Sequence, residues 1–273
     1  LLMKTKIDWS RSKKTAFRIS LALAFLISVG FADSRQSRMK CNELVITIVD
    51  TLGQSFVEPE DIRLMVLNKF GELKGQTLSS INIALLEKII ANNAFVADAE
   101  VFSSVDGKLN IEVRQRRPVV RVVNFNQESF YIDDKGVFMP LSEKYTARVP
   151  LANGYIFHRA SERQVSNNNS TKDNSVVDTI HSTMKNIFDV AHFVNHDDFW
   201  NAQVEQIYVN ADGDIELIPR VGRHNIILGN GQDLNDKFDR LFLFYTEGLS
   251  KSGWDKYKTI NLKFKDQVVC TKK

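Results

Sequence analysis

The chain has 273 residues, of which 36 are Lys or Arg and 33 are Asp or Glu, so its formal net charge is +3. Hydrophobic residues make up 43% of it, and it contains only 13 Gly and 5 Pro. This composition is typical of a folded protein and excludes a wholly disordered, collagen-like or low-complexity chain. Only one stretch is apolar enough to cross a bilayer, which excludes a membrane protein with several spans.

The positive charge is concentrated at the N-terminus. Residues 1–18 hold six basic side chains and one acid, Asp8, which leaves 30 basic and 32 acidic residues in the other 255. Binding to nucleic-acid phosphates needs a clustered basic excess, and the body of the chain has none. We therefore expect no nucleic-acid partner.

A basic tail (residues 1–15) precedes an apolar segment (residues 16–32) that predicts a single transmembrane helix. Eighteen residues without an acid, 15–32, span about 27 Å as a helix, close to the thickness of a bilayer core. The basic flank predicts a cytoplasmic N-terminus and an exported body. The alternative is a signal peptide cleaved after Ala32, because Gly30 and Ala32 are small. The apolar residues expected in the anchor include Ile19, Leu21, Leu23, Phe25, Leu26 and Ile27.

After a polar linker (residues 33–41), residues 42–116 show the order β-α-α-β-β. A strand is expected at 44–49, because the segment is rich in β-branched residues. Pro59, followed by Glu60 and Asp61, favours the start of a helix. A second helix is expected from about Ser79 to Asn92. Two strands, 99–102 and 109–113, are joined by the turn signal Asp106-Gly107.

Residues 117–273 predict a second, sheet-rich α+β region. Strands are expected at 119–125, 129–133, 137–140, 204–209, 215–218 and 224–228, and a last strand runs from Thr259 to Cys270 with Ile260, Leu262 and Phe264 alternating. Helices are expected at 177–191 and 234–245. The two cysteines, Cys41 and Cys270, lie far apart in the sequence, and a bridge between them is left open.

One group of residues has the composition of a metal site. His192 and His196 form an H-x-x-x-H pair, with Asp197 and Asp198 next to them, and on a helix the two histidines share a face. However, no Glu follows the first His, as it does in zinc proteases. Phe199-Trp200 also suggests a capped helix end at this point. The sequence indicates no cofactor, and an exported hydrolase or metal-binding protein using His192, His196 and Asp198 stays an alternative.

The first region resembles a POTRA domain, the β-α-α-β-β module of membrane-tethered assembly proteins. The segment Phe56–Ile62 matches the "fi-x-x-x-dI" pattern that opens its first helix. Residues 93–101 match "NPWV-x-x-A-x-V", with Ala94 and Phe95 in place of Pro and Trp. Residues 109–118 match "L-x-I-x-V-x-E-R-x-P", with Gln115 in place of Glu.

The whole chain resembles the FtsQ/DivIB family of bacterial cell-division proteins. Beyond the POTRA motifs, residues 131–138 match "y-l-i-D-x-x-G-v-f". Residues 225–229, 237–241 and 260–264 follow the order of the family's C-terminal β domain. The basic tail and single anchor match as well. The departures at Ala94, Phe95 and Gln115 indicate a divergent branch.

The resemblance implies a non-enzymatic scaffold in the plasma (inner) membrane at the division septum, with its bulk outside the cytoplasm. It implies binding to FtsB/DivIC-like and FtsL-like bitopic proteins and coordination of septal peptidoglycan synthesis. In the family the partner adds a strand at the end of the β domain, which maps to Lys263, Phe264, Asp266 and Val268. A last strand is often a sheet edge that accepts another chain. The alternative position of Phe264 is in the core, beside Ile260 and Leu262.

Another hypothesis of the same structural type is a POTRA-bearing outer-membrane assembly factor. It is disfavoured because no series of amphipathic strands long enough for a barrel follows the module.

Overall fold

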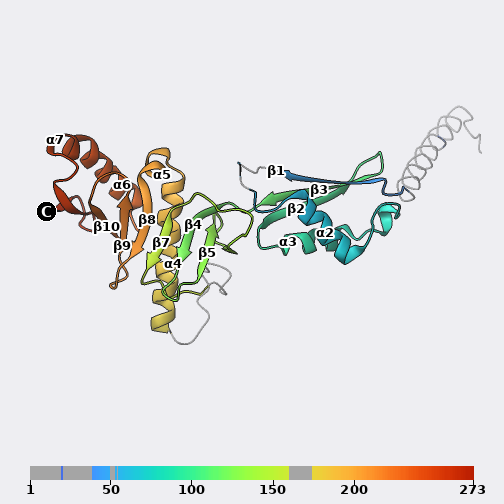
Figure 1. Cartoon of the computed structure of the whole chain (residues 1–273), viewed down its shortest axis with the longest axis horizontal. Coiled ribbons are helices and arrows are strands. Elements are labelled where there is room, and N and C mark those ends of the chain that lie inside the picture. Colours follow the sequence, from blue (N-terminus) through green and yellow to red (C-terminus); the bar gives the residue numbers. More distant parts are fainter. Residues whose placement is uncertain (1–19, 21–38, 50–52, 54, 160–173) are drawn as a thin grey trace, which may run out of the picture. The chain divides into compact units, whose positions relative to one another are not determined.

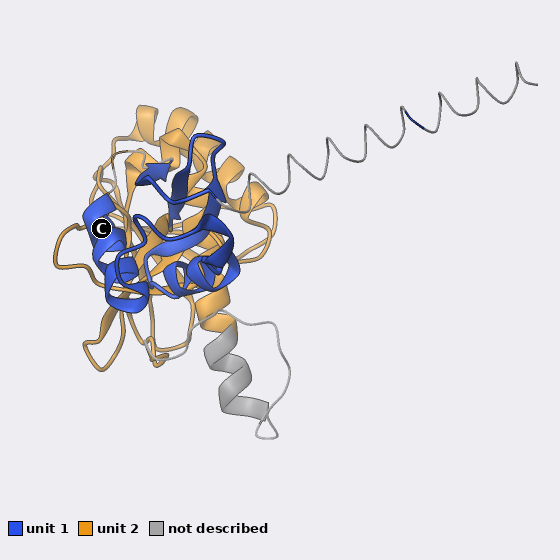
Figure 2. Ribbon diagram, turned by 90° about the vertical axis from the view of Figure 1, so that its right-hand side faces the viewer, with its two compact units in different colours: residues 1–51, 57–115 blue, residues 52–56, 116–273 orange. Residues whose placement is uncertain are grey.

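The computed structural model describes residue 20, residues 39–49, residue 53, residues 55–159 and residues 174–273. Contacts divide the chain into two compact units, Leu1–Thr51 with Val57–Gln115 and Leu52–Phe56 with Arg116–Lys273 (Figure 2). Among the described residues, no helix combines the length and the apolar character needed to span a bilayer. The expected anchor residues Ile19, Leu21, Leu23, Phe25, Leu26 and Ile27 lie outside the described residues.

Unit 1 is a three-stranded sheet with two helices. Its strands lie in the order β1-β3-β2, with β1 parallel and β2 antiparallel to β3 (Figure 1). The helices pack on one face, α2 against β1 and α3 against β2. The sheet contributes alternate buried side chains to the core, as the two-residue period of a strand requires. The elements are β1 (Glu43–Val49), α2 (Pro59–Phe70), the 3₁₀ turn η1 (Leu78–Ser80), α3 (Ile83–Ala91), β2 (Val96–Ser103) and β3 (Lys108–Gln115).

Local capping sets where the helices of unit 1 begin. Pro59 is the first residue of α2, and Glu58 and Asp61 form a reciprocal capping box before it. The second helix is shorter than expected from the sequence. The side chain of Asn82 accepts a hydrogen bond from the Leu85 N–H at 3.0 Å, so α3 starts at Ile83 and not near Ser79.

Unit 2 is built on a nine-stranded mixed sheet with the order β12-β11-β10-β9-β8-β7-β4-β5-β6 (Figure 1). Its strands are β4 (Pro118–Val123), β5 (Ser129–Asp133), β6 (Phe138–Pro140), β7 (Leu151–Gly154), β8 (Val204–Val209), β9 (Ile215–Pro219), β10 (Asn225–Gly229), β11 (Tyr257–Asn261) and β12 (Val269–Lys272). Its helices are α4 (Asn174–Asn195), α5 (Asp198–Gln203), α6 (Leu234–Leu243), the π-helical η2 (Phe244–Leu249) and α7 (Ser250–Ser252).

The core of unit 2 lies between its sheet and its helices. Helix α4 contacts β4 and β8 across the sheet, and Met184, Ile187 and Val194 on it are buried. Trp200 of α5 and Phe238 of α6 meet at a ring-centroid distance of 4.9 Å, which joins the C-terminal helices to the same core. The chain is therefore α+β in both units, as the sequence indicated.

The prediction of a single last strand, Thr259–Cys270, is wrong. Thr259–Cys270 forms two antiparallel strands, β11 and β12, joined by residues 262–268. The alternation of Ile260, Leu262 and Phe264 continues past the strand end, but only Ile260 and Leu262 are buried. Lys263 donates its N–H to the side chain of Asn261 at 2.9 Å, which replaces a ladder bond with a local turn.

Two further elements, β7 and α5, were not expected. The strand β7 pairs in parallel with β4 and β8 and joins the two halves of the sheet. Helix α5 begins because the side chain of Asp197 accepts the Trp200 N–H at 3.0 Å. The two cysteines are free thiols, Cys41 buried in unit 1 and Cys270 in β12 of unit 2.

Candidate partner-binding edge

The strand β12 lies at one end of the nine-stranded sheet. It pairs with β11 on one side only, and Val269, Thr271 and Lys272 are exposed. An edge strand presents backbone N–H and C=O groups that can pair with another chain. At the opposite end of the sheet, β6 spans only Phe138–Pro140, and its last residue is a proline, which cannot donate a ladder hydrogen bond. The β12 edge is therefore better suited than the β6 edge to pair with a strand of another chain.

The four residues expected to bind a partner lie beside this edge. Lys263, Phe264 and Asp266 lie in the β11–β12 loop, and Val268 precedes the first residue of β12. Phe264 is 52% exposed, so the alternative of a core position is wrong. Val268 is partly buried and packs on the core, so it supports the loop more than it offers a contact surface. Asp266 has a positive φ of 55°, a turn conformation that the short Asp side chain tolerates.

Lys263 is held by a neighbouring hairpin. Its Nζ forms an ion pair with Asp214, a residue of the β8–β9 turn whose side chain is 24% exposed. The stem of Lys263 also passes close to Gly229, where an added Cβ would meet Lys263 Cγ at 2.9 Å. Two elements thus position the side chain of Lys263, which stays 43% exposed.

Arg240 of α6 shapes the rest of the loop. Its guanidinium donates to the main-chain carbonyls of Phe264 (2.9 Å), Gln267 and Leu262 (3.4 Å). Asp236, one turn earlier, binds the same guanidinium at 2.9 Å. Because these bonds go to backbone atoms, the aromatic ring of Phe264 is left free to point to solvent.

The histidine pair does not form a metal site with the acids beside it. The rings of His192 and His196 stack at 4.1 Å, and His196 Nδ1 lies 2.7 Å from the His192 carbonyl. Burial, and then the nearby His196, lower the pKa of His192. Asp197 caps α5, as described above. Within the described ranges, no group of three or more His, Cys, Asp or Glu side chains could hold a metal ion.

The comparisons with known proteins agree with the sequence motifs. The model of the family described as FtsQ/DivIB, C-terminal related, matches residues 117–271, which is more than half of the chain. The chain belongs to the FtsQ/DivIB family. A POTRA-like domain matches residues 39–114, and a search of curated proteins found no match. FtsQ/DivIB proteins are generally non-enzymatic, and the two domains indicate a scaffold role in cell division.

Two residues of the candidate edge were not singled out in the sequence. Asp214 follows the turn signal Asp212-Gly213, and Arg240 lies in the FtsQ/DivIB-like segment 237–241. The local sequence around Asp214 and Arg240 does not predict their long-range partners. Those contacts depend on the order of the strands, which brings β9 and α6 to the 262–268 loop. The sequence pattern also predicts one strand where the structure has two, β11 and β12.

Proposed function

We propose that this FtsQ/DivIB protein is a membrane-anchored, non-enzymatic scaffold of the divisome. It binds FtsB/DivIC-like and FtsL-like bitopic proteins and helps to coordinate septal peptidoglycan synthesis. It crosses the plasma (inner) membrane once, through residues 16–32, with its N-terminus in the cytoplasm and its bulk outside, at the septum. The observation that carries the proposal is the β12 edge with the exposed Phe264 ring beside it.

The geometry favours a partner that is extended where it meets β12. Backbone hydrogen bonds along β12 contribute affinity that does not depend on the partner's sequence. Side chains next to the edge contribute specificity. Phe264 offers an apolar anchor that a partner side chain could cover. Lys263 offers a positive charge to an acidic group of the partner, in competition with Asp214. Asp266 and Val268 set the path of the loop between them.

The test is binding of the full chain, purified in detergent micelles, to the exported fragments of candidate FtsB/DivIC-like and FtsL-like proteins. Phe264→Ala is compared with Phe242→Ala, because Phe242 is also exposed, at 45%, but lies on α6. Lys263→Glu is compared with Lys251→Glu. We expect about tenfold or greater loss of affinity only for the two loop variants.

Circular dichroism establishes that each variant is folded. Equal binding by wild type, Phe264→Ala and Lys263→Glu would remove the loop from the proposed interface. Absence of binding by wild type to folded fragments would contradict the scaffold function itself.

A further inference from the structure

The two outer strands of the unit 1 sheet, β1 and β2, differ in how their free edges are protected. In the β2–β3 hairpin, the Ser104 N–H donates to the Lys108 carbonyl at 2.8 Å. Because hydrogen-bonded pairs alternate in antiparallel strands, the N–H groups of Ala99, Val101 and Ser103 point away from β3.

Carboxylates of the same chain occupy this outer side of β2. The Val101 N–H donates to Glu87 Oε1, from α3, at 2.9 Å, and the Ala99 N–H donates to Asp98 Oδ1 at 3.1 Å. A strand added here would have to displace both bonds and approach two negative charges. Blocking of this kind is a common protection against edge-to-edge pairing.

The β1 edge has no comparable protection in the part of the chain that is described. The Lys108 carbonyl points to β2, so the backbone groups of Leu109, Ile111 and Val113 point to β1. In a parallel pair only one of two opposite residues joins the ladder, and the residues opposite these three, Leu44, Ile46 and Ile48, therefore turn their N–H and C=O groups outward. The outward groups of Cys41 are paired with Gly75 and Gln76, at 2.7 and 2.8 Å. From Val45 onward, β1 is the outermost strand on its side of the described sheet.

The sequence of β1 suits pairing with itself. Its seven residues, ELVITIV, carry one charge, at the first position, and no Pro, Gly or Lys. Natural edges use charges, prolines or bulges to prevent association. In an antiparallel pair of copies centred on Thr47, Val45 of each copy faces Val49 of the other, and Thr47 faces Thr47. In this register Ile46 of each copy also lies opposite Ile48 of the other, and because both turn their backbone groups outward, each of these two pairs can exchange two hydrogen bonds. The pairs made by Val45, Thr47 and Val49 join β-branched side chains.

From these observations we infer that unit 1 is a homodimerisation module in which two copies join through their β1 edges, antiparallel and centred on Thr47. The interface is isologous, so each copy donates and accepts the same groups. The result is a six-stranded sheet with both pairs of helices on one face. This association is independent of the β12 edge of unit 2.

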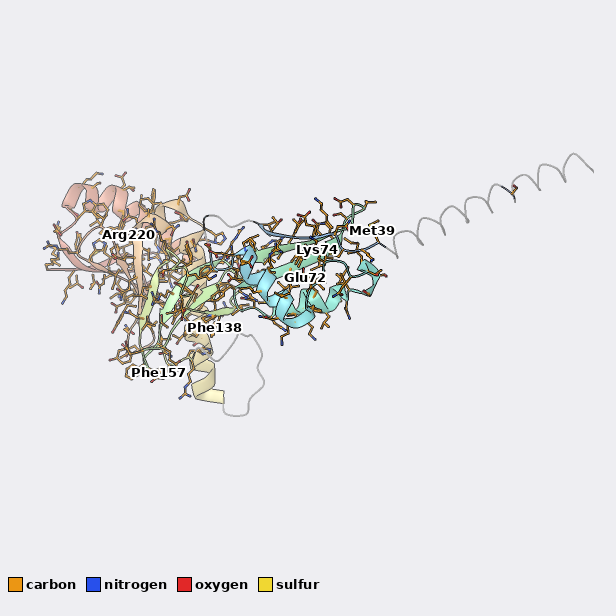
Figure 3. All side chains as sticks on the ribbon, turned by 45° about the vertical axis from the view of Figure 1, so that its right-hand side comes forward. Met39, Glu72, Lys74, Phe138, Phe157 and Arg220 are labelled. Atoms are coloured by element: carbon orange, nitrogen blue, oxygen red, sulfur yellow. The ribbon has the colours of Figure 1, made fainter. Side chains whose placement is uncertain are left out.

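The helix face beside β1 gives the inference a second support. Leu67 of α2 is 44% exposed, and with Leu44 and Val66 it lines a cavity of about 140 Å³ next to the strand. Glu72 and Lys74, labelled in Figure 3, belong to the polar rim of this cavity. A two-fold axis perpendicular to the sheet keeps both α2 helices on the same side. The second copy would therefore cover apolar side chains that a monomer leaves in water.

The test uses the full chain in a non-ionic detergent, with its protein mass measured by sedimentation equilibrium. We expect a dimer for wild type. Ile46→Pro removes an outward N–H from both copies without breaking a bond to β3, so association should weaken about tenfold or more. The matched control is Ser103→Pro, which removes an outward N–H from β2 and should leave the dimer intact.

A charge exchange tests the register. Thr47 is exposed, so Lys or Glu can be accommodated there. Thr47→Lys and Thr47→Glu each place like charges opposite each other and should be monomeric, whereas their equimolar mixture should dimerise. Circular dichroism checks folding, since Glu112 lies beside Thr47 on β3 and disfavours the Glu variant.

Wild-type protein that stays monomeric at about 100 µM, well above a micromolar dissociation constant, would overturn the inference. A dimer that persists in Ile46→Pro and in both charged variants would also overturn it, because the contact would then lie elsewhere.

Discussion

The guanidinium of Arg240 donates a hydrogen bond of 2.9 Å to the main-chain carbonyl of Phe264, a residue 24 positions later in the chain. The same side chain also reaches the carbonyls of Gln267 and Leu262. One arginine on α6 thus fixes three carbonyls of the β11–β12 loop. The loop is held in shape before a partner arrives, which lowers the ordering cost of binding.

Arg240→Ala should therefore loosen the loop. We expect a loss of about 1–3 kcal/mol in the free energy of unfolding, because the hydrogen bonds are made by a charged donor whose side chain is only 16% exposed. Amide hydrogen exchange of residues 262–268 should become faster. Urea unfolding and exchange mass spectrometry measure the two effects. Lys251→Ala removes only an exposed pair with Glu247 and should change neither.

The ion pair between Lys263 and Asp214 should be separable from partner binding. Lys263→Glu and Asp214→Lys each place like charges side by side, whereas the double variant restores an opposite pair. A double-mutant cycle should give a coupling of about 0.2–1 kcal/mol, since the pair is partly exposed. Partner affinity should stay low in the double variant, because the positive charge at position 263 is still lost. Recovery of affinity would show that Lys263 acts through Asp214 alone.

Asp133 should be critical for the stability of unit 2. Its fully buried carboxylate receives Arg116 at 2.8 Å and the N–H groups of Lys135 and Val137 at 3.0 and 2.7 Å. Asp133→Ala leaves the mostly buried Arg116 without its carboxylate, and we expect a loss of about 3–5 kcal/mol. Asp212→Ala, in the exposed β8–β9 turn, is the control and should cost much less. Equal urea midpoints for the two variants would contradict this assignment.

His224 should make unit 2 sensitive to acid. The residue is 2% exposed, and its Nε2 lies 2.9 Å from the Tyr245 hydroxyl. Burial, followed by the charge of Lys273, lowers the pKa of His224 below its ordinary value of 6.5. The unfolded chain therefore binds a proton at a higher pH than the folded chain does. Stability should be fully present above about pH 6.5 and should fall as the pH drops below it.

Urea midpoints at pH 7.5, 6.5 and 5.5 measure this slope. His224→Gln should reduce stability at neutral pH and flatten the slope between pH 6.5 and 5.5. His192→Gln is a necessary companion, because burial also lowers the pKa of His192 and acts in the same direction. An unchanged slope in His224→Gln would assign the acid sensitivity to another group.

Local chemistry was enough to predict much of the fold. As expected, Pro59 is the first residue of α2, and Asp106-Gly107 lies in the turn between β2 and β3. Gln115, which replaces the usual Glu of the family motif, acts as a hydrogen-bond acceptor: its Oε1 receives the Val57 N–H at 2.8 Å. A neutral amide suits this position because it is buried, where an unpaired carboxylate would be costly.

What the sequence did not predict depends on distant partners. The strand β7, Leu151–Gly154, contains Asn and Gly, and it is a strand because β4 and β8 lie on both sides of it. The end of β11 depends on Arg240, which binds carbonyls that a continuing strand would have used. The position of Phe264 follows from that ending. Hydrophobic alternation identifies a face while the strand lasts, but it does not show where the strand stops.

The parallel strand β7 also has a consequence for how unit 2 folds. The strands β4–β6 and β8–β10 are each antiparallel neighbours in sequence, so each group can form from local contacts. The sheet becomes continuous only when β7 is inserted between them, and Gly154 permits this because any Cβ there would lie 2.2 Å from the Val209 carbonyl. The four residues of β7 thus join the β4–β6 and β8–β10 meanders into one cooperatively folded sheet. We expect local unfolding of β7 to separate the two meanders.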